Sequence, residues 1–290
     1  MEILSTLING LSQGGIYAMI ALGYTMVYGI AKMLNFAHGD IIMAGGYTLL
    51  VMIGLTANPL AAVLAAVIVC VILGVVIEKV AYKPLRGASP LAVLITAIGV
   101  SYLLQSLAQI IFGPAPRMVN LLDMGDITIG SLTIHLYTLV TLICSTVVMT
   151  ALSLFVKFTR TGRAMIAVSE DRGAAQLMGI NVNRIITITF AIGSALAALA
   201  GFFMLIKAPT IANNFGAMPG IKAFTAAVIG GIGSIPGAML GGVLLGVVEC
   251  VSLKIEAIAP YTDAIEFSIL ILILLVRPTG FLGKKRREKV

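Results

Sequence analysis

Two carboxylates, Glu249 and Glu266, lie in or beside long apolar runs of this 290-residue sequence. An acidic side chain in a membrane-spanning segment is costly, and by default it marks a functional position such as a proton relay. Lys222 and Lys254 are candidate partners for these carboxylates, so we expect ion pairs near the outer membrane surface. The alternative is a proton relay, which would make the chain a stand-alone proton-driven secondary transporter or channel.

The stretch GGIGSIPGAMLGGVLLG, residues 230–246, is rich enough in glycine to suggest a phosphate-binding loop. A nucleotide-binding loop of the GxxxxGK[ST] type needs a lysine for the phosphates and a hydroxyl for magnesium, and the sequence has no such motif. The dinucleotide-binding pattern also fails at its third glycine. We therefore expect no cofactor on this chain and no ATP site.

Two breaks interrupt the apolar sequence. The first is the polar stretch NFAHGD, residues 35–40, and the second is the glycine-rich stretch at residues 230–236. Proline removes a backbone donor and glycine favours turns, so the second break should end one helix and start another. A broken helix at membrane depth is tolerated where it is buried in protein or lines a cavity. The alternatives are an ordinary cytoplasmic turn at the first break and tight packing through GxxxG spacing at the second. The residues that we assign to helix breaks near a solute pathway are Asn35, His38, Asp40, Gly231, Gly233 and Pro236.

Cysteine and histidine form no cluster along the sequence. Cys70, Cys144 and Cys250 lie in separate apolar runs, and His38 and His135 are isolated. A metal site needs ligands at helical or hairpin spacing, and a redox or zinc motif needs closely spaced cysteines. We expect no metal site and no disulfide.

Four arginines lie in TRTGRAMIAVSEDRGAAQLMGINVNR, residues 159–184. Each arginine at the centre of a membrane helix costs roughly 2.5–3.5 kcal/mol, so this segment does not span the membrane. It is also long for a bundle connection. We expect two short helices broken near residues 171–173, with Ser169 or Asp171 capping the second and Gly179 ending it. Such helices suit docking to a cytoplasmic protein, and a basic loop that touches lipid headgroups is the alternative.

The composition and the apolar runs predict the helices that carry the residues named above. The sequence is 59% hydrophobic and only 11% charged, too few charges to cover a soluble domain of this size. Clear apolar runs lie at 59–78, 89–112, 135–156 and 185–206, and shorter or glycine-interrupted runs at 3–30, 41–56, 223–253 and 263–276. Runs of about 20 residues are long enough to cross a bilayer as helices. The sequence predicts an all-α polytopic membrane helix bundle of about eight segments, with at least one broken or re-entrant helix, in a single domain over 1–290.

Basic residues gather in three regions: 79–86, 157–184 and a tail at 277–290. Loops rich in lysine and arginine stay in the cytoplasm, so the C-terminus is expected there. The first break is also assigned to the cytoplasm, which places the N-terminus outside and requires an odd number of crossings. The count of about eight is then off by one, at 223–253 or at 3–56. Residues 223–253 would then leave and return to the outer side, as two short crossings or as a re-entrant loop.

Five stretches of the chain resemble the LivH-type permease subunits of bacterial ABC importers for branched-chain amino acids. They are GGIYAMIALGYTMVYGIAKMLNFAHGD (14–40), EKVAYKPLRG (78–87), GRAMIAVSEDRGAAQLMGINVNR (162–184), KAFTAAVIGGIGSIPGAMLGG (222–242) and VRPTGFLG (276–283). The resemblance runs nearly end to end. One departure concerns the general importer signature, EAA followed three residues later by glycine, because Asp171 and Arg172 follow Glu170 here.

The resemblance implies a permease of the bacterial inner membrane. Its expected partners are two ATP-binding subunits, a second permease subunit that is homologous or identical, and an external solute-binding protein. Membrane lipid is also expected as a partner, and nucleic acid is not. The chain would be a transport subunit without a catalytic residue, and not an enzyme, because ATP and Mg²⁺ would bind to the partner ATPase subunits. The solute would be Leu, Ile or Val, with urea or an amide as the alternative within the family.

The resemblance also implies that residues 157–184 couple the permease to the ATPase. The residues that we assign to this contact are Arg163, Glu170, Asp171, Arg172 and Gly179. Changes in the ATPase dimer would move the docked helices, and the bundle would change the side to which its pathway opens.

Overall fold

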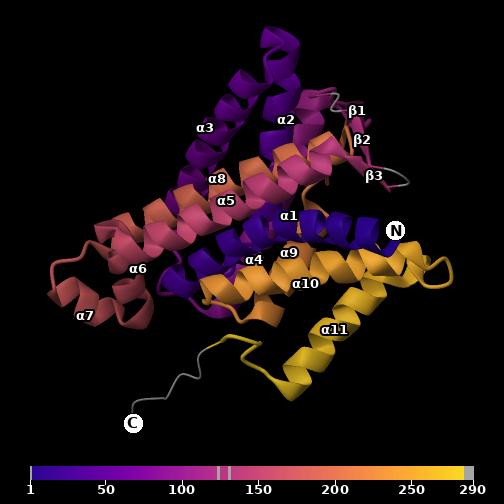
Figure 1. Ribbon diagram of the computed structural model, residues 1–290. Helices are drawn as coiled ribbons and strands as arrows, with labels where there is room; N and C mark the ends of the chain where they lie inside the picture. The colour runs from indigo at the N-terminus through magenta and orange to yellow at the C-terminus, as the bar shows by residue number, and fades with distance from the viewer. Residues whose placement is uncertain (1, 123–124, 130–131, 284–290) are drawn as a thin grey trace. The chain divides into compact units, whose positions relative to one another are not determined.

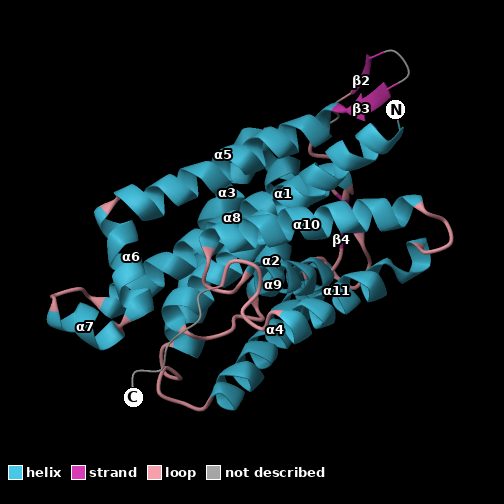
Figure 2. Cartoon of the chain, turned by 60° about the horizontal axis from the view of Figure 1, so that its bottom comes forward, coloured by secondary structure: helices cyan, strands magenta, loops and turns pink. Residues whose placement is uncertain are grey.

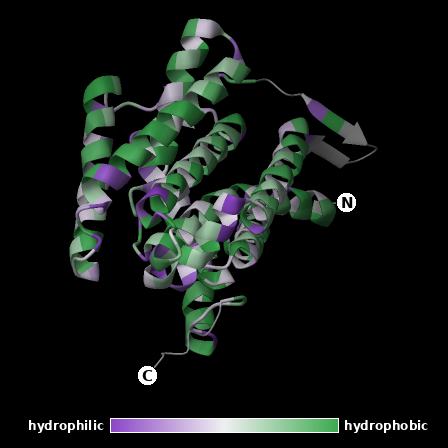
Figure 3. Ribbon diagram, turned by 90° about the vertical axis from the view of Figure 1, so that its left-hand side faces the viewer, coloured by the Kyte–Doolittle hydropathy of each residue, from purple (hydrophilic) through white to green (hydrophobic). Residues whose placement is uncertain are grey.

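The computed structural model describes residues 2–122, 125–129 and 132–283. Eight of the described helices are long and apolar enough to cross a membrane, which confirms the prediction of an all-α polytopic bundle. Most of the helical ribbon is hydrophobic, as Figure 3 shows. The basic tail predicted at 277–290 is only partly covered, because Lys284, Lys285, Arg286, Arg287 and Lys289 lie outside the described residues.

The predicted apolar runs correspond closely to the helices (Figure 1). In chain order they are α1 (Glu2–Ala31), α2 (His38–Thr56), α3 (Pro59–Ile77), the π-helical turn η1 (Glu78–Tyr82), α4 (Pro90–Phe112), α5 (Leu136–Phe158), α6 (Arg160–Glu170), α7 (Arg172–Leu177), α8 (Val182–Lys207), α9 (Ala217–Gly230), α10 (Ile235–Lys254), the 3₁₀ turn η2 (Ala259–Tyr261) and α11 (Thr262–Val276). The apolar run at 223–253 is thus two helices, α9 and α10, and α9 is the short one.

The strands are short and form two separate antiparallel pairs. β1 (Arg117–Met118) pairs with β4 (Thr210–Ile211), with Arg117 opposite Ile211. β2 (Asp126–Ile129) and β3 (Leu132–His135) form a hairpin with Asp126 opposite His135. In Figure 2 this hairpin lies beside the first turns of α1.

The chain divides into two compact units that share three continuous helices. Unit 1 comprises Met1–Thr25, Met124–Thr150 and Lys222–Val290, and unit 2 comprises Met26–Asp123 and Ala151–Ile221. Helices α1, α5 and α9 each begin in one unit and end in the other. The single domain over 1–290 stays a prediction.

Unit 1 contains a close contact between α1 and α10, which is built on glycine. A methyl group added to Gly10 or Gly14 of α1 would lie 2.9 or 2.6 Å from the Cα atoms of Val247 and Val243 on α10. Gly246 of α10 is equally restricted, because a methyl group there would overlap the backbone of Gly14. Small residues at GxxxG spacing allow helix backbones in a membrane to approach this closely.

Unit 2 is centred on α2, α3 and α8, which pack on one another over much of their length. Small residues again mark the contacts: Gly74 of α3 lies against Ser194 of α8, and Gly201 of α8 lies against Ile42 of α2. The short helices α6 and α7 precede α8 at its N-terminal end (Figure 1). Unit 2 therefore holds both the predicted coupling segment and the first predicted helix break.

Candidate coupling segment, helix breaks and ion cluster

The segment between α5 and α8 forms the two short helices that the sequence predicts. The Thr159 hydroxyl accepts a hydrogen bond from the Gly162 amide at 3.0 Å and caps α6. The chain then breaks at Asp171, whose carboxylate accepts from the Ala174 amide at 3.0 Å and caps α7. A side-chain acceptor at this position satisfies an amide that has no partner within the helix.

Of the two predicted caps for α7, Asp171 is right and Ser169 is wrong. The Ser169 hydroxyl instead donates to the Ile166 carbonyl at 2.7 Å, within α6. Gly179 lies two residues after the end of α7 with a φ of +82°, a left-handed conformation that glycine adopts without strain. The prediction that Gly179 ends the second helix is therefore confirmed.

The two short helices present an unusual apolar pair at their exposed end. Leu177 is 90% exposed and Met178 is 83% exposed, whereas Met165 and Val168 of α6 are buried. Arg163 and Glu170 lie on the exposed side of α6. Large apolar residues this exposed on an ordered segment are typical of a docking site. Leu177 and Met178 were not assigned to the coupling contact, because the sequence alone does not show which apolar residues of the two helices are exposed.

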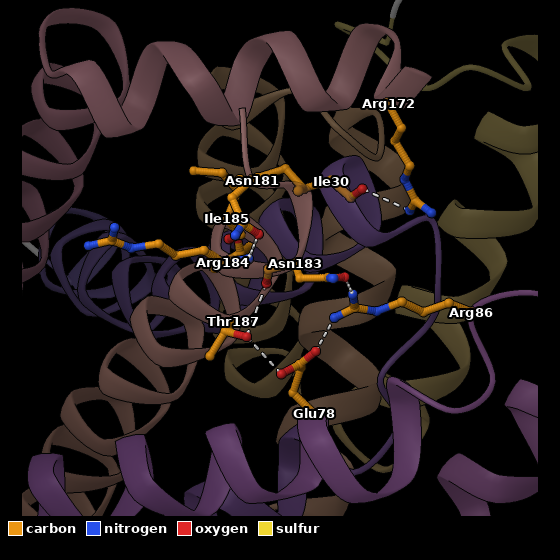
Figure 4. A network of polar contacts seen from close by, with 10 residues as sticks. Ile30, Glu78, Arg86, Arg172, Asn181, Asn183, Arg184, Ile185 and Thr187 are labelled. Atoms are coloured by element: carbon orange, nitrogen blue, oxygen red, sulfur yellow. Dashed lines mark hydrogen bonds and ion pairs between the residues drawn. The ribbon is translucent and has the colours of Figure 1, made fainter. Parts of the chain in front are cut away.

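Arg172 does not point into solvent with the other charges of this segment. Its guanidinium donates to the Ile30 carbonyl at 2.9 Å, which fixes the start of α7 to the last turn of α1 (Figure 4). Burial, and after it the positive charge of Arg86, lowers the pKa of Arg172 from its ordinary value. Both effects follow from its position inside unit 2, since burial disfavours the charged form and a like charge adds to this.

A polar network holds the start of α8 against η1 (Figure 4). The Arg86 guanidinium donates to the carboxylate of Glu78 and to the side-chain oxygen of Asn183. The Thr187 hydroxyl donates to the other Glu78 oxygen at 2.9 Å. Glu78 is fully buried, so its charge depends on these partners. This network was not predicted, although EKVAYKPLRG contains both of its charged residues.

The first predicted break lies between α1 and α2, and it is buried. The Tyr82 hydroxyl donates to the Asn35 side-chain oxygen at 2.9 Å, and the Gln105 amide donates to the Asp40 carboxylate at 2.8 Å. His38, at the start of α2, is also buried. The structure thus brings Asn35, His38 and Asp40 together in unit 2, where η1 and α4 satisfy polar groups that lipid could not. Their place beside a solute pathway stays a prediction.

The second predicted break separates α9 from α10 in unit 1. Gly231 and Gly233 have φ values of +106° and +95°, which most other residues adopt only with strain. Ser234 caps α10, and Pro236 lies in its first turn, where a proline fits without loss of a hydrogen bond. The prediction of a broken helix is confirmed, and Gly231, Gly233 and Pro236 all belong to the break.

The segment after α11 caps the C-terminal end of α9 through backbone hydrogen bonds. The amides of Phe281 and Leu282 donate to the carbonyls of Ile229 and Gly230, both at 2.9 Å. These carbonyls lie in the last turn of α9, which has no further helical turn to satisfy them. Two of the stretches that the sequence analysis singled out, 222–242 and 276–283, therefore meet at one end of unit 1.

An ion cluster joins α9, α10 and α11 in unit 1. The Lys222 ammonium lies 2.7 Å from Glu249, 2.8 Å from Asp263 and 3.3 Å from Glu266. The Tyr17 hydroxyl of α1 also donates to Glu249, at 3.1 Å. The predicted ion pairing of Glu249 and Glu266 is confirmed, with Lys222 as the partner. Asp263 was missed, because it stands at the edge of its apolar run and reads as an ordinary helix-start residue.

Comparisons with known proteins identify the family of the chain. Residues 6–274 match the family described as branched-chain amino acid transport system / permease component. The chain is 46% identical to the high-affinity branched-chain amino acid transport system permease protein BraD of Pseudomonas aeruginosa, over 99% of this chain and 98% of that protein. It is 42% identical to the corresponding permease protein LivH of Escherichia coli strain K12, over 99% and 97%. The chain, a multi-pass membrane protein, therefore belongs to the family of permease components of branched-chain amino acid transport systems.

Proposed function

We propose that this chain is the permease subunit of an ATP-driven importer that carries Leu, Ile and Val across the bacterial inner membrane. The solute is inferred from the names of the relatives, whose similarity extends over nearly the whole chain. Two ATP-hydrolysing subunits, a second permease subunit and an external solute-binding protein complete the importer. The chain itself holds no cofactor, and ATP and Mg²⁺ bind to the ATPase subunits.

The observation that carries this proposal is the exposed end of the segment α6–α7. Leu177 and Met178 project from a short helix whose start is fixed to α1 through Arg172. An apolar pair on a firmly held helix fits a cleft in a cytoplasmic partner. Arg163 and Glu170 would add charged contacts beside it. In this proposal Asp171, Arg172 and Gly179 act indirectly, because they set the shape and position of α7.

The proposed topology places the coupling segment and the C-terminus in the cytoplasm. An odd number of passages is then required, and α9 supplies the ninth beside the eight long helices. Its 14 residues extend about 21 Å, somewhat short of a hydrocarbon core of about 30 Å. The contact of residues 281–282 with the end of α9 supports this arrangement, because the break after α9 and the tail after α11 then lie on the same side.

The two helix breaks are the proposed flexible points beside the solute pathway. Each one interrupts hydrogen bonding within a helix, so a change in backbone direction there costs less than within a continuous helix. Asn35, His38 and Asp40 belong to the break in unit 2, and residues 231–236 form the break in unit 1. The proton-relay alternative has less support, because Lys222 pairs with both Glu249 and Glu266.

The test is an affinity purification of the tagged chain from gently solubilised native membranes, followed by mass spectrometry. The change is Leu177→Glu with Met178→Glu, and the matched control is Gln176→Glu, which adds one charge at a neighbouring exposed position of α7. The wild type and the control should bring down an ATPase and a second permease. The double variant should lose the ATPase selectively and should no longer support leucine uptake.

Two results would contradict the proposal. If the double variant retained the ATPase as well as the control does, α7 would not be the docking site. If the wild-type chain purified alone and supported uptake driven by a proton gradient without ATP, the stand-alone transporter would be correct. Uptake of urea instead of leucine in cells that contain the intact importer would change the solute while leaving the coupling mechanism in place.

A further inference from the structure

Unit 2 contains a cationic cavity of about 490 Å³. This volume is within the range of about 300–1,000 Å³ that is usual for small-molecule sites. Its charged lining consists of Lys32, Arg86 and Arg172, and its apolar lining includes Tyr28, Leu85 and Leu94. Among the described residues that line it, none is acidic. The cavity lies between the end of α1, the loop before α4, the start of α4 and the start of α7.

The charges of Arg86 and Arg172 exceed the negative charge in contact with them. The Lys32 ammonium donates to the Gly29 carbonyl and Arg172 donates to the Ile30 carbonyl, and both of these acceptors are uncharged. Arg86 pairs with the carboxylate of Glu78. The two guanidinium groups and this one carboxylate leave an excess of one positive charge, which an anion in the cavity would neutralise.

Two donors at this cavity have no acceptor. The Nε atoms of Arg86 and Arg172 are buried and make no hydrogen bond within the described structure. A buried donor without an acceptor is destabilising, and the guanidinium geometry matches phosphate oxygens well. The lowered pKa of Arg172, caused by burial and then by Arg86, fits the crowding of like charges at this cavity. The geometry therefore points to an anionic ligand with several acceptor oxygens.

The position of the cavity narrows the class of ligand. It lies at the end of one candidate span, α1, and at the beginning of another, α4. Leu91 of α4, which lines the cavity, is 63% exposed, and Ile95 on the next turn is 61% exposed. The cavity thus combines cations at the level of a membrane surface with an apolar helix face that continues toward the bilayer interior. A soluble anion would use the cations only, whereas a lipid would use both.

We propose that this cavity binds the phosphate headgroup of an anionic phospholipid, with an acyl chain lying along α4. The phosphate oxygens accept hydrogen bonds from Arg86, Arg172 and Lys32. Because of the excess positive charge, a net-anionic headgroup binds more tightly than a net-neutral one. Since Arg172 belongs to α7 and Lys32 follows α1, the bound lipid links the coupling segment to the first helix break. The site adds to the proposed transport function and does not depend on which solute is carried.

The best variant for a test is Lys32→Asn. Lys32 has a φ of +54°, and asparagine tolerates this left-handed conformation better than most residues, so the change removes the charge and spares the backbone. Lys83→Asn is the matched control, because Lys83 is an exposed lysine near the same loop and does not line the cavity. Arg172→Gln, alone and combined with Lys32→Asn, extends the series to a second lining cation.

The measurement is native mass spectrometry of the full chain, purified with its co-purifying subunits and titrated with phosphatidylglycerol or phosphatidylcholine. Each charge removed from the cavity should weaken the tightest phosphatidylglycerol binding about fivefold, and the double variant about thirtyfold. Lys83→Asn should bind like the wild type, and phosphatidylcholine should bind weakly to all. Thermal unfolding in lipid-free detergent is the control for folding. If Lys32→Asn has the melting temperature of the wild type there, its weaker phosphatidylglycerol binding is not caused by unfolding.

Several outcomes would overturn this proposal. Equal binding of phosphatidylcholine would remove the role of charge, and equal weakening by Lys83→Asn would make the effect a general surface attraction. Competition by soluble glycerol phosphate at the same concentration as the lipid would assign the site to a soluble anion. Loss of phosphatidylglycerol whenever the ATPase is bound would assign the cations to the protein partner. None of these results bears on ATPase binding by Leu177 and Met178, so the two proposals fail separately.

Discussion

Removal of the Lys222 charge should destabilise unit 1 strongly. Lys222 is 7% exposed, and Glu266, one of its partners, is fully buried. Lys222→Met keeps a long apolar side chain and removes the charge, so the carboxylates of Glu249 and Glu266 lose their common counter-ion. The third partner, Asp263, has a half-exposed side chain and can be solvated without Lys222. The cost therefore falls mainly on Glu266, which is fully buried, and on Glu249, whose side chain is 12% exposed.

The size of the effect follows from the cost of an unpaired buried charge. Removal of one partner from a buried ion pair costs about 3–5 kcal/mol. At about 2–4 °C per kcal/mol, the apparent melting temperature should fall by roughly 10 °C. Replacement of a whole buried ion pair by neutral groups is often nearly neutral. The triple variant Lys222→Met with Glu249→Gln and Glu266→Gln should therefore recover most of the loss.

The assay is thermal unfolding of the purified chain in mild detergent, at one fixed scan rate because unfolding of such a protein is irreversible. Lys254→Met is the control, since it removes an exposed lysine from α10. It should shift the melting temperature little, because exposed pairs contribute about 0–1 kcal/mol. The reasoning would be refuted if Lys222→Met melted like the wild type. It would equally be refuted if the triple variant melted at or below the temperature of the single one.

Two further predictions concern helix contacts and caps. Gly246→Ala should lower stability and the yield of folded protein, because the added methyl overlaps the backbone of Gly14. Gly99→Ala is the control and should have no such effect, because a methyl group there faces open space. Size-exclusion profiles of the solubilised variants test this. Asp171→Ala should increase the hydrogen-exchange rate of the α7 amides, including that of Ala174, because it removes a cap worth about 1 kcal/mol. Asp171→Asn should behave like the wild type, because asparagine is a comparable capping residue. Equal exchange in the two Asp171 variants would contradict the capping role.

The helices could be predicted from the sequence because the bilayer imposes a simple length rule. A span needs a continuous apolar run, and breaks need glycine, proline or polar residues, so the ends of α3, α4 and α8 fall within a few residues of the predicted runs. The two helices of the proposed coupling segment were also predictable, since their signals are local. Asp171 is a good cap and Gly179 a good terminator whatever lies around them.

The parts that escaped prediction depend on contacts between residues far apart in the chain. The pairing of Glu78 with Thr187 joins positions more than a hundred residues apart, and no local signal indicates it. The exposure of Leu177 also depends on the tertiary structure. The sequence indicates that leucine favours a helix here, but it does not indicate that this side chain faces outward. Arg172 was assigned to the coupling contact, whereas its side chain is held by a carbonyl of α1.

These long-range contacts connect the proposed docking site to the first helix break within unit 2. Arg172 holds α7 to the last turn of α1, and the chain enters the break immediately after that turn. On the other side of the break, Asn35 is held by Tyr82 of η1, the same turn that carries Glu78. Glu78 in turn contacts Thr187 near the start of α8, the helix that follows α7 in the chain. A displacement of α7 by an ATPase would therefore pull on the break from both ends, through α1 and through η1, so the break and not the rigid spans would absorb the movement.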